Sequence, residues 1–261
     1  MLSYQHIYHA GNLADVHKHV LLAAILERLT QKDKPLSYIE THAGRGLYDL
    51  SAPEAVRTGE AAAGVRVMEP RLPEAHAYRK RLAETRARFG GAAYPGSPLI
   101  AALSLRRGDV MHLAELHPRE YEALAAVIAP FGAHLRREDG FAAARALTPP
   151  TPRRGLMLID PSFELKSDYA AIPGHMAALH RKWNVGILAL WYPILNSGLH
   201  TPMVAALREA FLGALCHEVR FPAAREGHGL VGSGMFIVNP PWGIDQEAAR
   251  LQTLFDHLKG H

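Results

Sequence analysis

Short apolar segments alternate with helical segments along most of the 261-residue chain. Apolar runs of about four to eight residues between turn residues are typical of buried strands. Helical segments, such as residues 118–129 and 168–183, separate most of these runs. Such an alternation predicts a parallel sheet with helices on both faces. The candidate strands are residues 36–41, 110–116, 133–138, 155–160, 185–191, 215–221 and 233–239.

The last two candidate strands are connected differently from the others. Residues 222–232 between them are glycine-rich and too few for a crossover helix, so the final strand is expected to run antiparallel to its predecessor. Six parallel strands completed by one antiparallel strand are the architecture of class I methyltransferases that use S-adenosylmethionine (SAM). We therefore predict a Rossmann-like α/β fold of this class with a seven-stranded, mainly parallel sheet.

The segment between the first two strands is longer than an α/β connection requires. After the turn at Gly44 and Gly46, roughly 60 residues precede the second strand. We predict an inserted helical subdomain at residues 51–94, within a methyltransferase domain of residues 1–50 and 95–261. Its most helical part, residues 74–89, is basic, and charge alone supports an RNA-facing patch and a solvated helix face equally. The basic residues are Arg79, Lys80, Arg81, Arg86 and Arg88.

Composition limits the cellular setting and the partners. Cys216 is the only cysteine, which excludes an intramolecular disulfide and a zinc site of several thiolates and suits the reducing cytoplasm, where we expect the protein. The early apolar run at residues 20–26 is too short to span a bilayer and follows no basic segment, so no membrane association or export is expected. The net charge of +4 permits a polyanionic partner without requiring one.

Acidic residues lie at the ends of the first three strands. Glu40 ends the first strand before a Gly44-x-Gly46 turn, where backbone can approach a nucleotide closely. Glu115 ends the second strand, where a carboxylate can accept both ribose hydroxyls of a nucleoside, and Asp139-Gly140 ends the third. Each of these residues alone also fits a turn or a helix cap. Together they predict an adenosine site.

The fourth strand leads into Asp160-Pro161-Ser162-Phe163, which resembles the Asp-Pro-Pro-Tyr motif of methylases that modify exocyclic amino groups. The lone pair of adenine N6 is delocalised into the ring and must be localised before it can attack a sulfonium methyl. Asp160 and the Pro161 carbonyl can accept the N6 hydrogens, with Asp160 placed to take the proton. Phe163 would stack on a base turned out of its helix. A strand-ending turn with a core phenylalanine is the structural alternative.

A rival match occurs at Asn239-Pro240-Pro241-Trp242, which fits the general amino-methylase pattern better letter for letter. Strand direction favours Asp160, because an antiparallel final strand would end at the edge opposite the cofactor. Trp242 is then expected to be a structural plug at that opposite edge.

Histidines are frequent near the N-terminus, at His6, His9, His17 and His19. No His-Glu-x-x-His helix motif or thiolate accompanies them, so we expect no metal and interpret them as hydrogen-bonding groups, with His17 at the surface. Three further segments have a structural and a functional interpretation. Residues 94–98 form either a rigid turn or a helix N-terminus that binds an anion. Residues 190–193 are an aromatic strand end, either buried in the core or placed at the ligand edge. Residues 225–234 are a glycine-rich loop, either a mobile cover over RNA or a flexible link.

A series of short sequence motifs, in the same order along the chain, is similar to the large-subunit ribosomal RNA methyltransferase J family. The similarity extends over essentially the whole chain, which makes it more specific than any single motif. The motifs are residues 1–4, 9–12, 14–16, 18–19, 41–44, 94–98, 115–118, 139–141, 153–155, 190–193 and 239–242.

This resemblance implies SAM-dependent N6-methylation of one adenine in 23S ribosomal RNA. Because the base must be extruded, we expect protein-free or partly assembled RNA as the substrate, with no obligate protein partner. Ser162-Phe163 departs from the family's Pro-Tyr, which keeps a stacking face but loses the second proline and the tyrosine hydroxyl. The implied SAM contacts are His19, His42, Ser97, Glu115, Asp139, Gly140 and Asp160; Asp160 is also the implied catalytic residue, and Tyr4 would touch the RNA beside Pro161 and Phe163.

Two alternatives come from other functional classes. Some relatives have been linked to the use of external DNA as a nutrient, which would make the protein DNA-binding or DNA-processing, although no nuclease metal constellation is evident. A catalytically silent RNA-binding protein with the cofactor fold is the second alternative, given the altered turn after Asp160. SAM binding without methyl transfer would distinguish the silent protein from the enzyme.

Overall fold

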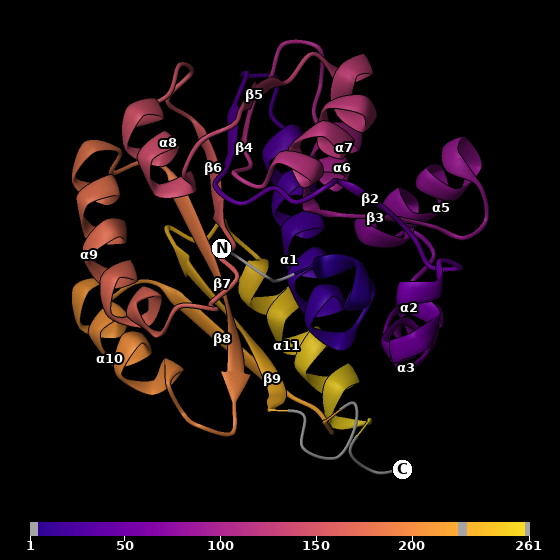
Figure 1. Ribbon diagram of the computed structural model, residues 1–261. Helices are drawn as coiled ribbons and strands as arrows, with labels where there is room; N and C mark the ends of the chain where they lie inside the picture. Colours follow the sequence, from indigo (N-terminus) through magenta and orange to yellow (C-terminus); the bar gives the residue numbers. More distant parts are fainter. Residues whose placement is uncertain (1–4, 224–228, 259–261) are drawn as a thin grey trace.

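The computed structural model describes residues 5–223 and 229–258 (Figure 1). Its main sheet has the strand order β5-β4-β1-β6-β7-β9-β8. β9 pairs antiparallel with both β7 and β8, and the other pairs are parallel. The predicted fold class is confirmed. The strands are β1 (Ser37–Glu40), β4 (Val110–Ala114), β5 (His134–Arg136), β6 (Gly155–Ile159), β7 (Ile187–Leu195), β8 (Leu215–Arg220) and β9 (Leu230–Val238).

Helices cover both faces of this sheet (Figure 1). Helix α1 (Leu13–Thr30) is buried along most of its length, because it packs against β9, α6, α11 and the inserted helices at once. No helix within residues 5–223 and 229–258 is long and apolar enough to cross a membrane. Beside α1 lie α6 (Ser97–Ser104), α7 (Pro118–Ile128) and α11 (Ile244–Asp256), and on the other face lie α8 (Gly140–Leu147), α9 (Lys166–Lys182) and α10 (His200–Ala210).

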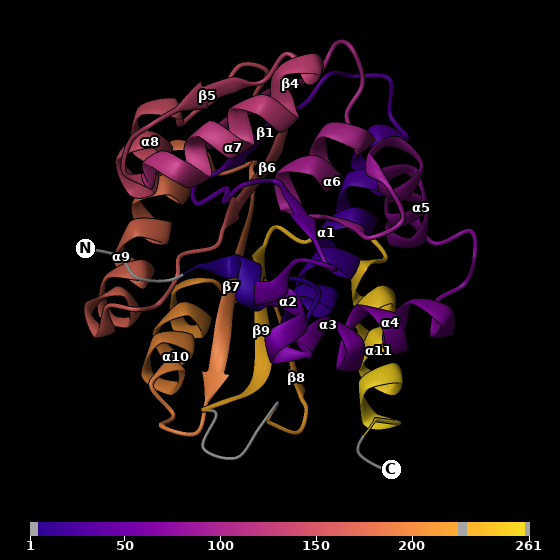
Figure 2. The same cartoon turned by 45° about the vertical axis from the view of Figure 1, so that its right-hand side comes forward.

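The long connection between β1 and β4 contains the predicted helices. Figure 2 brings this region forward beside α1. Tyr78 and Leu82 of α5 are fully buried and belong to the same hydrophobic cluster as α1. The division into a subdomain of residues 51–94 stays a prediction. The elements are β2 (Leu47–Asp49), α2 (Pro53–Thr58), α3 (Glu60–Ala63), α4 (Val65–Met68), α5 (Ala77–Phe89) and β3 (Ala93–Pro95), with β2 and β3 paired antiparallel; short 3-10 turns are η1 (His6–Tyr8), η2 (Glu69–Arg71) and η3 (Ala129–Phe131).

The basic side chains of α5 have acceptors nearby. Arg86 makes two hydrogen bonds of 2.7 Å to Glu69, and Arg88 makes one of 2.6 Å to Glu84. These contacts fit the solvated and locally balanced helix face, and the RNA-facing patch stays a prediction. The other contacts are Arg79 to the Leu72 carbonyl, Arg81 to the Leu103 carbonyl and Lys80 to Glu27.

Two strand boundaries differ from the predicted ones. β7 continues to Leu195, so residues 190–193 lie within the strand and not at its end, because pairing with β9 continues as far as Leu230. β9 begins at Leu230, so residues 230–234 of the predicted glycine-rich loop are strand. Arg225 and His228 of that loop lie outside the described residues.

The rival motif after β9 lies at the sheet edge opposite the ends of β1, β4 and β6. The Asn239 amide donates to the carbonyls of Asn184 and Gly186, at 2.9 and 2.8 Å, just before β7 begins. The strand-direction argument against this motif is thus confirmed. Trp242, however, is 79% exposed, with Arg28 5.1 Å from its ring centroid. The predicted plug is wrong, because the chain turns into α11 at Gly243 and leaves the indole outside the core.

Candidate active site

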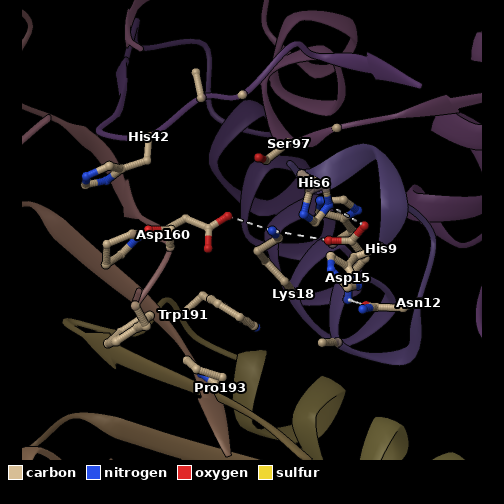
Figure 3. Close-up of a pocket in the computed structure, with 18 of the residues that line it drawn as sticks. His6, His9, Asn12, Asp15, Lys18, His42, Ser97, Asp160, Trp191 and Pro193 are labelled. Atoms are coloured by element: carbon tan, nitrogen blue, oxygen red, sulfur yellow. Dashed lines mark hydrogen bonds and ion pairs between the residues drawn. The ribbon is translucent and has the colours of Figure 1, made fainter. Parts of the chain in front are cut away.

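A cavity of about 300 Å³ lies at the carboxyl edge of the parallel strands. The turns after β1, β4 and β6 converge there, because parallel strands end at the same edge of a sheet. Side chains of β7, α1 and the segment before α1 complete the wall (Figure 3). Tyr4 lies outside the described residues. Of the predicted site residues, those that line the cavity are His19, His42, Ser97, Glu115, Asp160, Pro161 and Phe163.

Glu115 holds the glycine turn that follows β1. Its Oε2 accepts from the Gly44 amide at 2.8 Å and its Oε1 from the His117 amide at 2.7 Å. Gly44 has φ +62°, in the left-handed region that favours glycine. Burial raises the pKa of Glu115, and the two amide donors oppose that rise. Each carboxylate oxygen keeps a lone pair for a further donor, such as a ligand hydroxyl.

Asp160 is paired with a buried lysine of α1. Lys18 Nζ is 2.6 Å from Asp160 Oδ2 and 3.3 Å from Asp15 Oδ1, so it bridges the two carboxylates (Figure 3). Asp15 also accepts from His6 and from the Gly11 amide, both at 2.9 Å. Burial alone would lower the pKa of Lys18, but the two carboxylates outweigh burial and raise it. Lys18 is therefore a fixed cation that orients the Asp160 carboxylate at the cavity.

Two cavity histidines are held neutral. His19 Nδ1 is 2.9 Å from the Tyr94 hydroxyl, while its Nε2 is buried with no hydrogen-bond partner among the described residues. Burial lowers the pKa of His19 to about 3 and that of His42 to about 4. His42 is placed by a 2.7 Å contact with Thr41 Oγ1. A buried ring nitrogen without a partner is unfavourable, so His19 Nε2 indicates a position where a ligand polar group fits.

Glu40 lies beneath the cavity and does not line it. It is fully buried and accepts from Ser97 Oγ at 2.5 Å and from the Tyr38 hydroxyl at 2.8 Å. Ser97 itself lines the cavity, so Glu40 fixes the orientation of a wall residue. Burial raises the pKa of Glu40 to about 8, although both hydrogen bonds oppose the rise.

Glu40→Gln is expected to flatten the dependence of stability on pH. A native pKa of about 8 exceeds the ordinary 4.5, so the folded state binds the proton more tightly and stability falls as pH rises through this range. The slope from one carboxyl is at most about 1.4 kcal/mol per pH unit. Denaturant unfolding at about pH 5 and about pH 8 should show wild type losing more stability than the variant. Equal losses would contradict the raised pKa.

Asp139 and Gly140 lie beside the cavity and are not part of its lining. Asp139 caps α8, because its carboxylate accepts from the Ala142 amide at 2.8 Å. A Cβ atom at Gly140 would lie 2.0 Å from the Thr41 carbonyl oxygen, so only glycine permits this close approach. Both residues have structural roles here, and their contact with SAM stays a prediction.

Phe163 is 7% exposed, and only part of its ring reaches the cavity. Its ring centroid is 4.7 Å from that of Tyr169. The backbone at Phe163 has φ +54°, a region that non-glycine residues rarely adopt and that recurs at functional sites. The turn after Asp160 thus combines features of both interpretations: a largely buried phenylalanine and an unusual backbone at the cavity.

Several cavity residues were not assigned a site role from the sequence. Asp15, Lys18 and His19 have the i, i+3, i+4 spacing of one helix face, and this polar stripe in an otherwise apolar helix could have identified Asp15 and Lys18. His17 was expected at the surface, which is wrong: it is fully buried against β8 and β9. The segment before α1 contributes His6, His9 and Asn12.

A metal site in the part of the chain that the structure describes would need several ligating side chains placed together. No group of three or more histidine, cysteine, aspartate or glutamate side chains is placed there to hold an ion. The cavity histidines instead contact hydroxyl groups or carboxylates, such as Tyr94 and Asp15.

The strand order, the single antiparallel strand β9 and the cavity at the carboxyl edge are the architecture of class I methyltransferases, the class whose methyl donor is SAM. The sequence family described as "Ribosomal RNA large subunit methyltransferase D, RlmJ" matches residues 33–260. The chain belongs to this family of ribosomal RNA methyltransferases, and the resemblance stated from its sequence is confirmed.

Two curated relatives agree with this assignment, and a solved structure is similar over nearly the whole chain. The chain is 39% identical over 252 residues to "Ribosomal RNA large subunit methyltransferase J" of Escherichia coli strain K12, covering 95% of this chain and 90% of the relative. It is 36% identical over 254 residues to the protein of that name in Haemophilus influenzae, with the same coverage. A crystal structure of a Legionella pneumophila protein has a TM-score of 0.83 and 34% identity, covering 95% and 94% of the two chains.

Proposed function

We propose that this protein transfers a methyl group from SAM to N6 of one adenine in 23S ribosomal RNA. The observation that carries the proposal is the turn Asp160-Pro161, whose residues line the same cavity as Glu115 and His19. This combination provides a nucleoside site and a proton acceptor in one cavity. Relatives with this family name support ribosomal RNA as the substrate.

The cavity residues fit the chemical groups of SAM. Glu115 keeps lone pairs for the ribose hydroxyls, beside a glycine turn that allows close backbone approach. The buried Nε2 of His19 and the hydroxyl of Ser97 offer polar contacts to the amino acid part. His42 would lie against the nucleoside. When bound, SAM supplies an electrophilic methyl group on its sulfonium sulfur.

Asp160 and Pro161 would activate the adenine amino group. The carboxylate of Asp160 and the carbonyl of Pro161 accept the two N6 hydrogens and draw the nitrogen lone pair out of conjugation with the ring. As the new N–C bond forms, the bond between the methyl carbon and the sulfonium sulfur breaks with its electron pair going to sulfur, and one N6 proton passes to Asp160, which acts as the general base. Lys18, 2.6 Å away, keeps the carboxylate oriented during this transfer.

Transfer of labelled methyl from SAM tests the proposal directly. Protein-free 23S RNA, intact ribosomes and duplex DNA are compared as acceptors, and the modified nucleoside is identified. We expect N6-methyladenosine in protein-free RNA alone, because the base must leave its helix to reach Asp160. Transfer to DNA alone would favour the DNA-processing alternative. SAM binding without transfer would favour a catalytically silent relative.

Two further expectations belong to this proposal. The RNA is recognised without an obligate protein partner, and the reaction takes place in the cytoplasm. Methyl transfer by purified protein to RNA transcribed in vitro would support the first expectation, since no other protein is then present.

A further inference from the structure

A buried polar chain leads from the cavity wall to the far side of α1. Trp191 on β7 lines the cavity, and its Nε1 donates to Ser233 Oγ on β9 at 2.9 Å. Ser233 Oγ is 2.8 Å from His17 Nδ1, and His17 Nε2 is 2.9 Å from His217 Nδ1 on β8. Ser233 and His17 are fully buried. This series of hydrogen bonds therefore links one cavity residue, Trp191, to α1, β8 and β9.

The indole fixes the donor at one end of this series of hydrogen bonds, and the tautomer of His17 sets the others. An indole N–H only donates, so Ser233 Oγ accepts from Trp191. In the His17 tautomer whose Nδ1 accepts from the serine hydroxyl, the Nε2–H of His17 donates to His217 Nδ1. Burial lowers the pKa of His17, which agrees with a neutral ring that donates from one nitrogen only. In this arrangement each hydrogen between Trp191 and His217 Nδ1 is used once, and a serine lone pair stays directed at the indole.

A buried indole N–H needs only one acceptor, so hydrogen-bond satisfaction of Trp191 does not explain His17. Burying an imidazole behind that acceptor is unfavourable unless the imidazole is itself hydrogen-bonded. What His17 adds is control of direction: it binds the hydroxyl hydrogen of Ser233 and prevents that hydrogen from turning towards the indole.

The Trp191 ring lies beside the residues that surround Asp160. Lys18 Nζ is 5.4 Å from its ring centroid, and the Phe163 ring is 6.1 Å away at an interplanar angle of 67°. Phe163 is largely buried, whereas Trp191 is half-buried and lines the cavity. A flat aromatic face next to a proton acceptor has the chemistry that receives an unstacked nucleobase.

Resting on the proposed function, we propose that Ser233 and His17 are positioning residues that hold the Trp191 indole as the wall against which the substrate adenine lies beside Asp160. Trp191 is then a specificity-determining contact for a purine ring. Neither Ser233 nor His17 touches the reacting atoms, so their effect passes through the indole.

A double-mutant cycle tests the coupling of Ser233 to Trp191. Ser233→Ala, Trp191→Phe and the double variant are compared with wild type by methylation of 23S RNA at saturating SAM. Loss of the serine acceptor is expected to raise the KM for RNA about tenfold, with kcat within about threefold and SAM affinity unchanged. Phenylalanine has no N–H to satisfy, so Ser233→Ala should add no further rise in the Trp191→Phe background.

The His17 arm uses a conservative variant as its control. His17→Asn keeps an acceptor near the Nδ1 position and should hold the KM for RNA within about twofold of wild type, whereas His17→Leu should raise it as Ser233→Ala does. Thermal unfolding of every variant checks that the protein is folded. A KM change in Ser233→Ala that persists unchanged beside Trp191→Phe, or no KM change at all, would overturn the positioning role.

Fluorescence separates this inference from the proposed function. In a Trp242→Phe background, Trp183 and Trp191 are the remaining tryptophans, and Trp183 is fully buried with its own acceptor. Ser233→Ala should lower the emission anisotropy by freeing the Trp191 indole. Unchanged anisotropy would overturn the positioning role whatever the activity. An inactive wild type with this anisotropy loss would instead overturn the proposed reaction and keep the positioning role.

Discussion

Replacing Asp160 by asparagine is expected to lower kcat for RNA methylation by about 10³-fold, a loss within the range contributed by a general base. Asparagine keeps the shape of the side chain and an oxygen for Lys18, but it cannot take the N6 proton. Lys18 retains Asp15 at 3.3 Å, so the buried ammonium keeps one carboxylate partner in the variant. The measurement is single-turnover methylation at saturating SAM and RNA, with SAM affinity determined separately.

The matched control lies in the rival motif at the opposite sheet edge. Trp242 is 79% exposed and is not part of the cavity lining, so Trp242→Phe should leave kcat within about twofold. A kcat for Asp160→Asn within about tenfold of wild type, or about 1.4 kcal/mol of barrier, would show that Asp160 is not the base. A large loss in Trp242→Phe would revive the rival motif.

Glu115→Gln is expected to raise the Kd for SAM by about 100-fold, because hydrogen bonds to a charged group are worth about 1.5–3 kcal/mol each. The carboxylate accepts from the amides of Gly44 and His117 and keeps lone pairs for two ribose hydroxyls. A glutamine amide would present its own hydrogens to one of those amide donors. Both the turn after β1 and the ribose contact are therefore weakened. Isothermal titration with SAM measures the change.

Activity at saturating SAM distinguishes a binding role of Glu115 from a catalytic one. Glu115 has no contact with Asp160, so kcat should stay within about threefold once the site is filled. Glu69→Gln is the matched control, because Glu69 pairs with Arg86 outside the cavity and should leave the Kd unchanged. A Kd for Glu115→Gln within about threefold of wild type would remove Glu115 from the nucleoside site.

The rival motifs show what strand order alone can decide. Asp160 and Asn239 follow strands of opposite direction, and direction followed from the short link before the last strand. That inference needed no side-chain packing and was confirmed. Strand direction did not predict whether Trp242 is buried, because the turn at Gly243 and the position of Arg28 determine whether the ring is covered.

The acidic strand ends show the limit of the same reasoning. Glu40, Glu115 and Asp139 all lie near one sheet edge as predicted, yet only Glu115 lines the cavity. Glu40 is held below it by Ser97 and Tyr38, and Asp139 caps α8. The rotation of each carboxylate depends on donors from other elements, which a strand-end position does not specify.

The sequence by itself determined the α/β class, the direction of the last strand, the family and the placement of Glu115 and Asp160 at one edge. These follow from local apolar periodicity, from the lengths of the connections between strands and from sequence motifs, which are properties of residues that are neighbours in the chain. Only the tertiary structure brought Lys18 to Asp160 across 142 positions, and His17 to Ser233 across 216. Such pairs form because α1 is buried along most of its length, so its buried polar side chains need partners from distant elements, and the packing angle of the helix decides which ones.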